Sequence, residues 1–511
     1  MRIGIAQVDS RVGDLSANAR NIREAVAALV PGAPEVVLLP ELALTGYPPR
    51  DLLYDPDLVA AALRAQERLA RELEGGPPAL VGGIWPGPAW PRHPSLYNAA
   101  LLLHRGEVRL AQAKRLLPSY DLFVEARWFL PGPTSPPLPF GAQRAGVLVC
   151  EDLWQEGYPV QPVDLAREAG ATVLFSLSAS PYRQGALARR FAHARATGLP
   201  IVYVNGVGAN DELILDGGSF VLNGAGQLVA MLPRFEEAVD IVELDGEELT
   251  APVEDLDTLR QALVAGIRGF ARKNGLRRAV LGLSGGVDSA LVAVLACEAL
   301  GASSVTALAL PSRYTDPRST QSARELAETL GCRFEVQPIE ALHAAAEALV
   351  GAEGGTTMEN VQARLRMILL MARVNREGGM LLNTSNKTEL ALGYGTLYGD
   401  LAGALSPIGD LGKHTVYALA RHMGGIPAFI LDRPPSAELR PEQVDPFDYA
   451  RVGPEVDSGL ARAAGLPGEA MEAGLARMVR ASEHKRRQAG VVLKVSDAAF
   501  GSGRMMPVAR G

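Results

Sequence analysis

Cysteine is scarce in this chain of 511 residues, with copies only at positions 150, 297 and 332. An odd number of widely spaced cysteines cannot form a complete disulfide framework, and such sparing use suits a reducing compartment. The chain has no Cys-x-x-Cys pair, and its seven histidines are scattered, so sequence spacing offers no zinc site. We therefore expect free thiols, and we expect any bound metal to be held by oxygen ligands.

Long apolar stretches and an excess of basic residues are missing as well. No window holds the roughly 18 uncharged apolar residues that a membrane span requires. The first residues, MRIGIAQVDSRVGDLS, lack the basic, apolar and small-residue sections of a signal peptide, so we expect a soluble protein of the cytoplasm. The net charge of -7 argues against a broad basic surface. We expect no nucleic-acid partner and no membrane partner, although a local basic pocket could still bind a small anion.

The chain is rich in short apolar runs that alternate with helical segments. Because a single hydrophobic core rarely serves more than about 300 residues, this length indicates two large domains. Runs such as EVVLLPEL and ATVLFSLSAS predict strands of a layered α/β domain that reaches about residue 245. The acidic, proline-containing stretch at 242–258 is typical of a linker. After it, βαβ connections predict a mainly parallel sheet. We place the two domains at residues 1–250 and 251–511.

The string GLSGGVDS, residues 282–289, follows a predicted strand and opens a predicted helix. Two adjacent glycines let the backbone approach an anion closely, and the first N–H groups of the helix add donors. The loop lacks the lysine of a Walker A motif and does not read G-x-G-x-x-G. A glycine pair by itself is as well explained by a tight turn. Asp288, beside Ser289, suggests a carboxylate that positions Mg²⁺ next to phosphates.

The whole string resembles the SGG-x-DS signature of the ATP pyrophosphatase superfamily. Members of this superfamily cleave ATP between the α- and β-phosphates, adenylate an oxygen of a substrate, and let a nitrogen or sulfur nucleophile displace AMP. MENVQARLRMILL, LNTSNKTELALGYG, PPSAELRPEQVD and SEHKRRQ further resemble, in order, the signatures of NAD synthetases. The resemblance implies a doubly wound parallel-sheet domain of the adenine nucleotide alpha hydrolase-like type.

This resemblance also implies roles for single residues. The residues assigned to ATP are Gly282, Leu283, Ser284, Gly285, Gly286, Val287, Asp288, Ser289 and Thr384. The residues assigned to deamido-NAD are Asn360, Glu389 and Lys485, and those assigned to Mg²⁺ are Asp288 and Glu389. The family usually continues after PPSAELRPEQVD with Glu and a longer acidic segment, whereas here PFDYARVGP follows Asp445. We therefore expect the region between the two nucleotide sites to differ in detail.

Basic residues near the C-terminus fit an anionic dinucleotide. His484, Lys485, Arg486 and Arg487 could together neutralise its phosphates and carboxylate. By themselves they are equally well explained as a solvated helix face. Asp400 and Lys413 are weaker candidates, since GDLAG and DLGK could serve only as turn and helix-start sequences.

Cys150 ends the apolar run GVLVC and is followed directly by Glu151 and Asp152. A free cysteine in such a place is usually a packed small hydrophobe. As a nucleophile it would need a base and a cation from elsewhere in the chain. Glu41 and Lys114 stand at the ends of two other predicted strands, where such residues are ordinarily solvated. The residues alone leave both interpretations open.

With their flanks and order, Glu41, Lys114 and Cys150 resemble the Glu-Lys-Cys triad of the nitrilase superfamily. The resemblance implies a four-layer αββα sandwich for the first 245 residues. In that chemistry Glu41 takes the thiol proton, Cys150 attacks a carboxamide and Lys114 stabilises the oxyanion. Glu151 and Asp152 would shape the site. Such domains fused to NAD synthetases act as glutaminases.

The same resemblance suggests Tyr120 and Ser180 as glutamine contacts. The family usually has Lys or Arg six residues after that serine, but Ala186 stands there. Arg183 or Arg189 could hold the glutamine α-carboxylate instead. Glu125 could align Lys114, although a surface ion pair would explain it equally well.

Both halves together resemble the glutamine-dependent NAD synthetases. The resemblance implies that the first domain releases ammonia from glutamine, and that the second uses ATP and Mg²⁺ to convert deamido-NAD into NAD, AMP and pyrophosphate. It also implies a homo-oligomer. Two alternatives stay open: another glutamine-fed adenylating amidotransferase, and an ammonia-using NAD synthetase whose first domain is regulatory and not catalytic.

Overall fold

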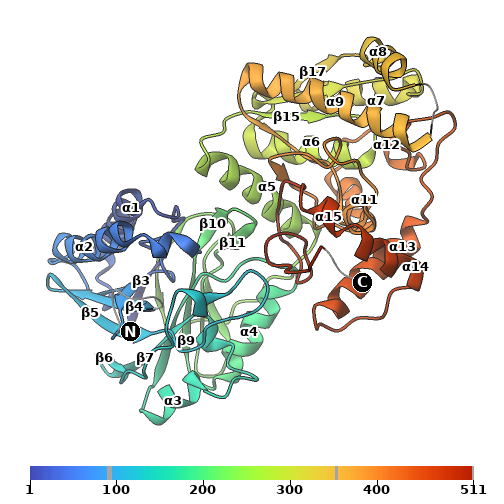
Figure 1. Ribbon diagram of the computed structural model, residues 1–511. Coiled ribbons are helices and arrows are strands. Elements are labelled where there is room, and N and C mark those ends of the chain that lie inside the picture. Colours follow the sequence, from blue (N-terminus) through green and yellow to red (C-terminus); the bar gives the residue numbers. More distant parts are fainter. Residues whose placement is uncertain (89–94, 352–354, 509–511) are drawn as a thin grey trace. The chain divides into compact units, whose positions relative to one another are not determined.

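The structure is a computed structural model that describes residues 1–88, 95–351 and 355–508. It divides into two compact units, Met1–Glu254 and Asp255–Gly511 (Figure 1). In the described part of the chain, no helix is both long enough and apolar enough to cross a membrane.

The first unit contains two six-stranded sheets. The strands of one sheet lie in the order β14 (Ala238–Glu243), β1 (Arg2–Gln7), β2 (Val36–Leu38), β3 (Ala79–Pro86), β4 (Leu96–His104) and β5 (Glu107–Ala113). Those of the other lie in the order β13 (Leu228–Met231), β12 (Phe220–Leu222), β9 (Ile201–Asn205), β8 (Val173–Ser178), β7 (Gln143–Val149) and β6 (Leu138–Phe140). A hairpin of β10 (Val207–Asn210) and β11 (Leu213–Asp216) stands apart.

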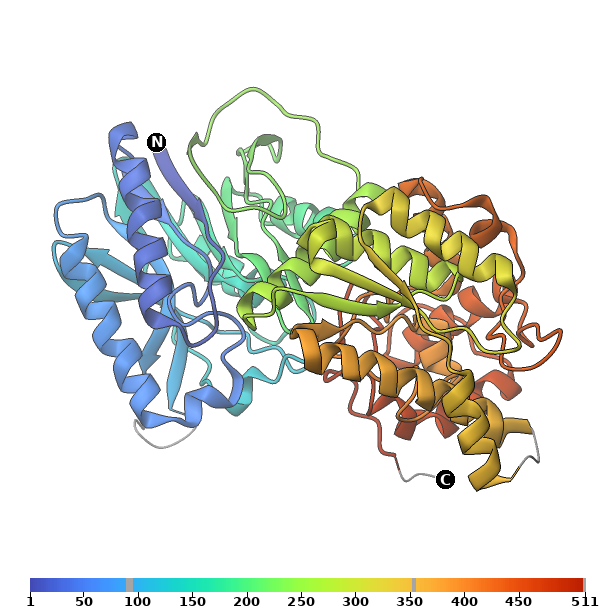
Figure 2. The same ribbon diagram turned by 90° about the horizontal axis from the view of Figure 1, so that it is seen from above.

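Apolar side chains of both sheets form one buried core between them, including Ile5, Leu38, Val147 and Phe175. Alternate residues of the same strands face outward, where helices cover them. Helices α1 (Leu15–Leu29) and α2 (Pro56–Glu72) lie side by side on the first sheet (Figures 1 and 2). Helices α3 (Pro162–Glu168) and α4 (Ala186–Ala196) cover the second. The predicted αββα sandwich is confirmed.

The stretch that was predicted to be a linker is shorter than 242–258. Strand β14 continues to Glu243, and helix α5 already begins at Leu256. The side chain of Asp255 caps α5 by accepting from the backbone N–H of Thr258, and the Thr258 hydroxyl returns a bond to the cap. This capping box satisfies helix donors that would otherwise be unpaired. The helix therefore starts before the apolar run from which it was predicted.

A four-stranded parallel sheet forms the centre of the second unit. Its strands lie in the order β17 (Arg333–Val336), β16 (Val305–Ala309), β15 (Ala279–Gly282) and β18 (Met380–Leu381). The helices of this layer are α5 (Leu256–Lys273), α6 (Val287–Leu300), α7 (Pro317–Leu330), α8 (Glu340–Val350) and α9 (Gly355–Glu377). The chain runs outward from β15 to β17 and then returns to β18 on its other side. This reversal is the switch point at which doubly wound sheets bind ligands.

Short helices complete the second unit. They are α10 (Lys387–Leu392), α11 (Lys413–Met423), α12 (Ala428–Asp432), α13 (Tyr449–Ala463), α14 (Ala473–Ala481) and α15 (Glu483–Arg486). A small parallel pair, β19 (Leu405–Ser406) and β20 (Val491–Val492), joins distant segments of this region. Leu390, Val452, Val456 and Val479 belong to its buried cluster. The predicted α/β class with a parallel sheet is confirmed.

Candidate active sites

Three strand ends of the first unit bring a carboxylate, an ammonium group and a thiol together. Glu41 follows β2, Lys114 directly follows β5, and Cys150 directly follows β7. Their exposed fractions are 2%, 1% and 9%, respectively. The Lys114 Nζ donates to Glu41 Oε1 at 2.8 Å, and both charges act on the Cys150 thiol. These groups come from segments far apart in the sequence, so only the fold assembles them.

The protonation of this group follows from its burial. Burial raises the pKa of the Cys150 thiol well above its ordinary value, and Glu41 raises it further, while Lys114 opposes both. Burial acts against the charged form of Lys114, but Glu125 and Glu41 outweigh it and raise the pKa of Lys114 well above its ordinary value. The resting site therefore pairs a neutral thiol with a protonated lysine, and a base must take the thiol proton before sulfur can attack.

Glu125 is a buried member of this group. Its Oε1 accepts from Lys114 Nζ at 2.9 Å and from the Tyr47 hydroxyl at 3.0 Å. Burial raises the pKa of Glu125 to about 6, with Lys114 lowering it and Glu41 raising it. The alternative of a surface ion pair is wrong, because the Lys114 and Glu125 side chains are almost fully buried.

Asn98 is a buried neighbour of the triad that the sequence interpretation missed. Its Nδ2 donates to Glu41 Oε1 at 2.6 Å, and its backbone carbonyl accepts from the Lys114 N–H at 2.8 Å. The only available signal was a lone amide within the apolar run LYNAALLL of β4. A buried amide needs hydrogen-bond partners. Glu41 provides one for Nδ2, whereas Oδ1 has none within the described residues.

The turn that carries Cys150 is held by Asp152. Cys150 has a φ of 46°, in the left-handed region that non-glycine residues rarely adopt. The Asp152 carboxylate accepts from the Val149 N–H at 3.0 Å and from the Arg115 and Leu116 N–H groups at 2.9 Å each. Asp152 thus joins the turn around Cys150 to the segment after Lys114.

Two tyrosines donate hydrogen bonds to Glu151, the residue after Cys150. Glu151 is buried and accepts from the Tyr120 hydroxyl at 3.0 Å and from the Tyr158 hydroxyl at 2.9 Å. Tyr120 is 49% exposed, so its ring reaches from solvent to the residue after the nucleophile. Glu151 and Tyr120 therefore form a wall beside Cys150, and Tyr120 connects this wall to the protein surface.

Arg183 lies beside this wall. Its Nη2 pairs with Asp121 Oδ2 at 3.0 Å, its guanidinium stands 5.9 Å from the Phe123 ring centre, and its charge acts on the Tyr120 hydroxyl. Ala186 begins α4 and is buried. Arg183 is thus a cation whose charge acts on the Tyr120 hydroxyl.

The Ser180 backbone is fixed by deeper groups. Its N–H donates to Asn205 Oδ1 at 2.8 Å, and its hydroxyl accepts from Arg190 Nε at 3.3 Å. Arg190 is fully buried and pairs with Asp216 at 2.8 Å. Ser180 is therefore tied to a buried ion pair and sits two residues after β8.

In the second unit, the predicted phosphate loop joins β15 to α6. Gly285 has a φ of 81°, and a Cβ there would lie 2.4 Å from the Ser319 carbonyl oxygen. The Ser284 and Ser289 hydroxyls lie 3.1 Å apart, and Gly286 caps the helix. The predicted strand, loop and helix are confirmed.

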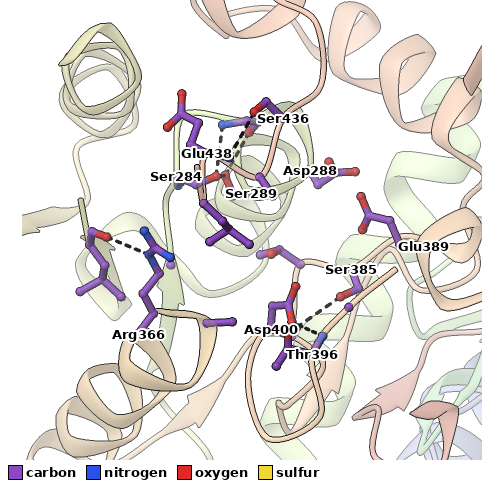
Figure 3. A pocket seen from close by; sticks show the side chains of 18 of the residues that line it. Ser284, Asp288, Ser289, Arg366, Ser385, Glu389, Thr396, Asp400, Ser436 and Glu438 are labelled. Carbon is purple, nitrogen blue, oxygen red and sulfur yellow. Dashed lines mark hydrogen bonds between the residues drawn. The ribbon is translucent and has the colours of Figure 1, made fainter. Parts of the chain in front are cut away.

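A cavity of about 530 Å³ opens at the carboxyl ends of β15, β16 and β18 (Figure 3). Its size is that of an ordinary ligand pocket. The predicted residues in its wall are Gly282, Leu283, Ser284, Gly286, Val287, Asp288, Ser289, Asn360, Thr384, Glu389 and Lys485. Gly285 is absent from the wall because it faces the Ser319 backbone. The weaker candidates Asp400 and Lys413 do line the cavity.

Two carboxylates of the cavity meet one lysine. The Lys413 Nζ contacts Asp288 and lies 3.4 Å from Glu389 Oε1, while Asn386 Nδ2 donates to Asp288 Oδ1 at 2.9 Å. Asn386 and Glu389 also form the capping box of α10. Burial, then Asp288, raises the pKa of Glu389 to about 8, against the effect of Lys413.

These residues fit Mg²⁺. The ion is typically bound through one or two carboxylates together with substrate phosphates, and here two carboxylates converge beside a phosphate loop. Among the described residues, no group of three or more His, Cys, Asp or Glu side chains that could hold a metal ion is found.

The four basic residues 484–487 near the C-terminus lie in different environments. Lys485 Nζ donates to the Gly393 and Gly395 carbonyls at 2.8 Å each and lines the cavity. Arg486 is buried against backbone carbonyls, whereas His484 and Arg487 are exposed. A single four-residue basic patch is therefore wrong, because successive helical residues point in different directions.

Two tyrosines that the sequence interpretation missed hold Asp445. The hydroxyls of Tyr394 and Tyr449 donate to its two oxygens at 3.1 and 3.0 Å. Tyr449 comes from the segment that departs from the usual family pattern, and Lys413 Nζ lies 5.2 Å from its ring centre. The departing segment thus contacts Asp445 and Lys413, which line the cavity.

Two family models match the chain. Carbon-nitrogen hydrolases match residues 2–251, and NAD synthases match residues 259–489. The glutamine-dependent NAD(+) synthetase of Synechocystis sp. is 39% identical over 99% of this chain and 98% of its own. That of Rhodobacter capsulatus is 42% identical over 87% of this chain and 84% of its own.

Among solved structures, the glutamine-dependent NAD+ synthetase from Acinetobacter baumannii, in complex with ADP, is similar over 99% of this chain and 98% of its own, with a TM-score of 0.79 and 30% identity. The fold and the two sites define a ligase that combines an amide-hydrolysing domain with an ATP-using domain. The chain belongs to the family of glutamine-dependent NAD(+) synthetases. It is a glutamine-hydrolysing, ATP-dependent enzyme that synthesises NAD+, which decides against other glutamine-fed amidotransferases.

Proposed function

We propose that Cys150, Glu41 and Lys114 carry out the glutaminase reaction. Glu41 accepts the thiol proton as the sulfur bonds to the carboxamide carbon, and it then returns a proton to the departing ammonia as the C–N bond breaks. Water, deprotonated by Glu41, hydrolyses the resulting thioester and releases glutamate. The contact between Lys114 and Glu41 beside the buried Cys150 thiol is the observation that supports this most strongly.

Lys114 supplies the positive charge for the oxyanion, and Glu125 is a positioning residue. Glu125 and Glu41 accept from the same ammonium group, which fixes its position, and its charge acts on the Cys150 thiol. A charge held in place before the reaction costs no reorganisation when the oxyanion forms.

Glutamine binds through Tyr120, Ser180 and the wall around Glu151. Arg183 takes the α-carboxylate in place of the residue that Ala186 lacks. This is supported by its charge beside Tyr120 and by the position of Tyr120 against Glu151.

Replacing Arg183 by glutamine is expected to raise the KM for glutamine by about 10- to 100-fold, since a lost hydrogen bond to a charged group costs about 1.5–3 kcal/mol. The KM for ammonium should stay unchanged because ammonium does not use this wall. Initial rates with each nitrogen donor measure both. Arg144→Gln, an exposed arginine of the same unit, is the matched control. Equal glutamine KM values in Arg183→Gln and wild type would remove Arg183 from the site.

The synthetase reaction takes place in the cavity of the second unit. The phosphate loop and Thr384 bind ATP, and Asn360, Glu389 and Lys485 bind deamido-NAD. Asp288 and Glu389 hold Mg²⁺, which when bound offsets the charge of the phosphates. A carboxylate oxygen of the nicotinate group bonds to the α-phosphorus of ATP as pyrophosphate leaves. Ammonia then bonds to the carboxyl carbon, and AMP departs.

We propose further that residues 1–250 are the glutaminase domain, that residues 251–511 are the synthetase domain, and that the enzyme is a homo-oligomer of the cytoplasm. The matched ranges and the compact units support the boundary. The free cysteines agree with a reducing compartment. Light scattering of the purified protein tests the oligomer, and a monomer would contradict it.

One assay tests the proposed reaction as a whole. Purified enzyme with deamido-NAD, ATP, Mg²⁺ and glutamine should yield NAD+, AMP, pyrophosphate and glutamate, and omission of Mg²⁺ should stop NAD+ formation. XMP and aspartate, offered in place of deamido-NAD, are the substrate controls. Amidation of either at a similar rate would contradict the assignment of the second site.

A further inference from the structure

Four basic side chains line the cavity of the second unit: Arg366, Lys413, Arg433 and Lys485. Two of them are neutralised by carboxylates. Lys413 pairs with Asp288 and Glu389, and Arg433 Nη2 lies 3.0 Å from Glu438 Oε1. Within the described residues, Lys485 donates to two carbonyl groups, and it is already assigned to the dinucleotide. Arg366 is the cation of this wall that has neither an ion pair in the described chain nor a role in the proposed reaction.

Arg366 belongs to the cavity-facing side of α9. It is half-buried, and its Nε donates to the Leu310 carbonyl at 2.9 Å (Figure 3). Within residues 255–351 and 355–508, no other hydrogen-bond acceptor and no carboxylate partner of its guanidinium is found. The terminal NH₂ groups of Arg366 are therefore available to a ligand in the cavity.

The nearest carboxylates are occupied by other groups. Glu438 pairs with Arg433 and accepts from the Ser319 hydroxyl at 2.7 Å, and Asp400 Oδ1 accepts from the Thr396 N–H at 2.6 Å. Burial lowers the pKa of Arg366 to about 10, and the fields of Glu438 and Asp400 only partly offset this. A partly buried charge without an ion-pair partner is costly, and a bound anion would reduce that cost.

The position of Arg366 restricts which anion it can reach. In Figure 3 it stands on the opposite side of the cavity from Asp288 and Glu389. The nicotinate carboxylate must react near these two residues if they hold Mg²⁺ beside the α-phosphate. An anion at Arg366 is therefore remote from the reacting atoms. The remaining anionic groups of both nucleotides are phosphates, which suit the planar fork of arginine.

We propose that Arg366 forms a phosphate-binding subsite for one of the two nucleotides in this cavity. The inference rests on the proposed binding of ATP and deamido-NAD there. The dinucleotide is the favoured source because Arg366 and Lys485 both act on Asp400 and thus flank the same carboxylate. ATP is the other source of the same chemical group.

Arg366→Gln tests the proposal with ammonium as nitrogen donor, so that the first unit is bypassed. The KM for one nucleotide should rise about 10- to 100-fold, the loss expected for a charged hydrogen bond. The KM for the other nucleotide should change little, which shows that the cavity is folded. A rise for deamido-NAD identifies the dinucleotide phosphate, and a rise for ATP identifies the triphosphate. Arg366→Lys should recover part of the affinity because it keeps the charge.

Arg376→Gln is the matched control, since Arg376 is an exposed arginine in the last turn of the same helix. Unchanged KM values for both nucleotides in Arg366→Gln would overturn the subsite while leaving the proposed function intact. Equal rises of both KM values, together with a lower Tm and no recovery in Arg366→Lys, would assign Arg366 a structural role and also overturn it. Failure of the wild-type enzyme to make NAD+ would instead count against the proposed function.

Discussion

Cys150→Ala is expected to abolish NAD+ synthesis from glutamine while ammonium-driven synthesis continues at the wild-type rate. Loss of a nucleophile typically costs about 10⁴-fold or more in kcat, and neither Glu41 nor Lys114 can form the missing thioester. The cysteine is 9% exposed and follows a strand of the first unit, so alanine fits the same space. Rates of NAD+ formation with glutamine and with ammonium chloride measure the two activities separately.

Cys332→Ala is the matched control, because it removes a thiol of the second unit that no proposed step uses. Undiminished glutamine use in Cys150→Ala would contradict the proposed nucleophile. The expected result instead requires that Cys150 itself releases the nitrogen.

Asp288→Asn is expected to lower NAD+ synthesis by about 10²- to 10³-fold with either nitrogen donor. A metal ion at a phosphoryl group contributes several kcal/mol to the transition state, and each 1.4 kcal/mol is about tenfold in rate. Asparagine keeps the shape of Asp288 but not its charge. It also leaves Lys413 with Glu389 as its remaining carboxylate partner in the described chain. Steady-state rates at saturating and at raised Mg²⁺ concentrations measure the effect.

Asp432→Asn serves as the control, because Asp432 is a largely exposed carboxylate of the same unit whose pair with Arg421 spans 3.8 Å. Such exposed pairs contribute little. Cys150→Ala and Asp288→Asn should depend differently on the nitrogen donor. Cys150→Ala should lose NAD+ synthesis from glutamine only, whereas Asp288→Asn should lose synthesis from both glutamine and ammonium. A wild-type ammonium rate in Asp288→Asn would remove Asp288 from the synthetase site.

Local sequence predicted the elements that carry the chemistry. The apolar run before Cys150 is a buried strand, and GLSGGVDS joins a strand to a helix because glycine alone tolerates the close Ser319 backbone at position 285. Strand ends were also identifiable for Glu41 and Lys114. Their meeting was predicted through family resemblance, since nothing local shows which strand ends become neighbours.

What the sequence did not predict depends on burial and pairing between distant segments. Glu125 could equally have been exposed, and only packing against Lys114 and Tyr47 makes its surroundings apolar. Asn98 is brought to Glu41 by strand pairing. The four basic residues 484–487 do not form one patch, because successive helical positions face different directions. Among them, Lys485 is the residue that lines the cavity in the described structure.

The position of Lys413 between Asp288 and Glu389 has a consequence for the order in which ligands arrive. Its ammonium group already balances part of the charge of both carboxylates, so free Mg²⁺ must displace it without compensation. ATP brings phosphates that can accept the displaced lysine, so the metal should enter together with the nucleotide and not before it. Titration of the enzyme with Mg²⁺ should therefore give weak binding alone and much tighter binding with ATP present. Tight Mg²⁺ binding without nucleotide would contradict this sequential assembly.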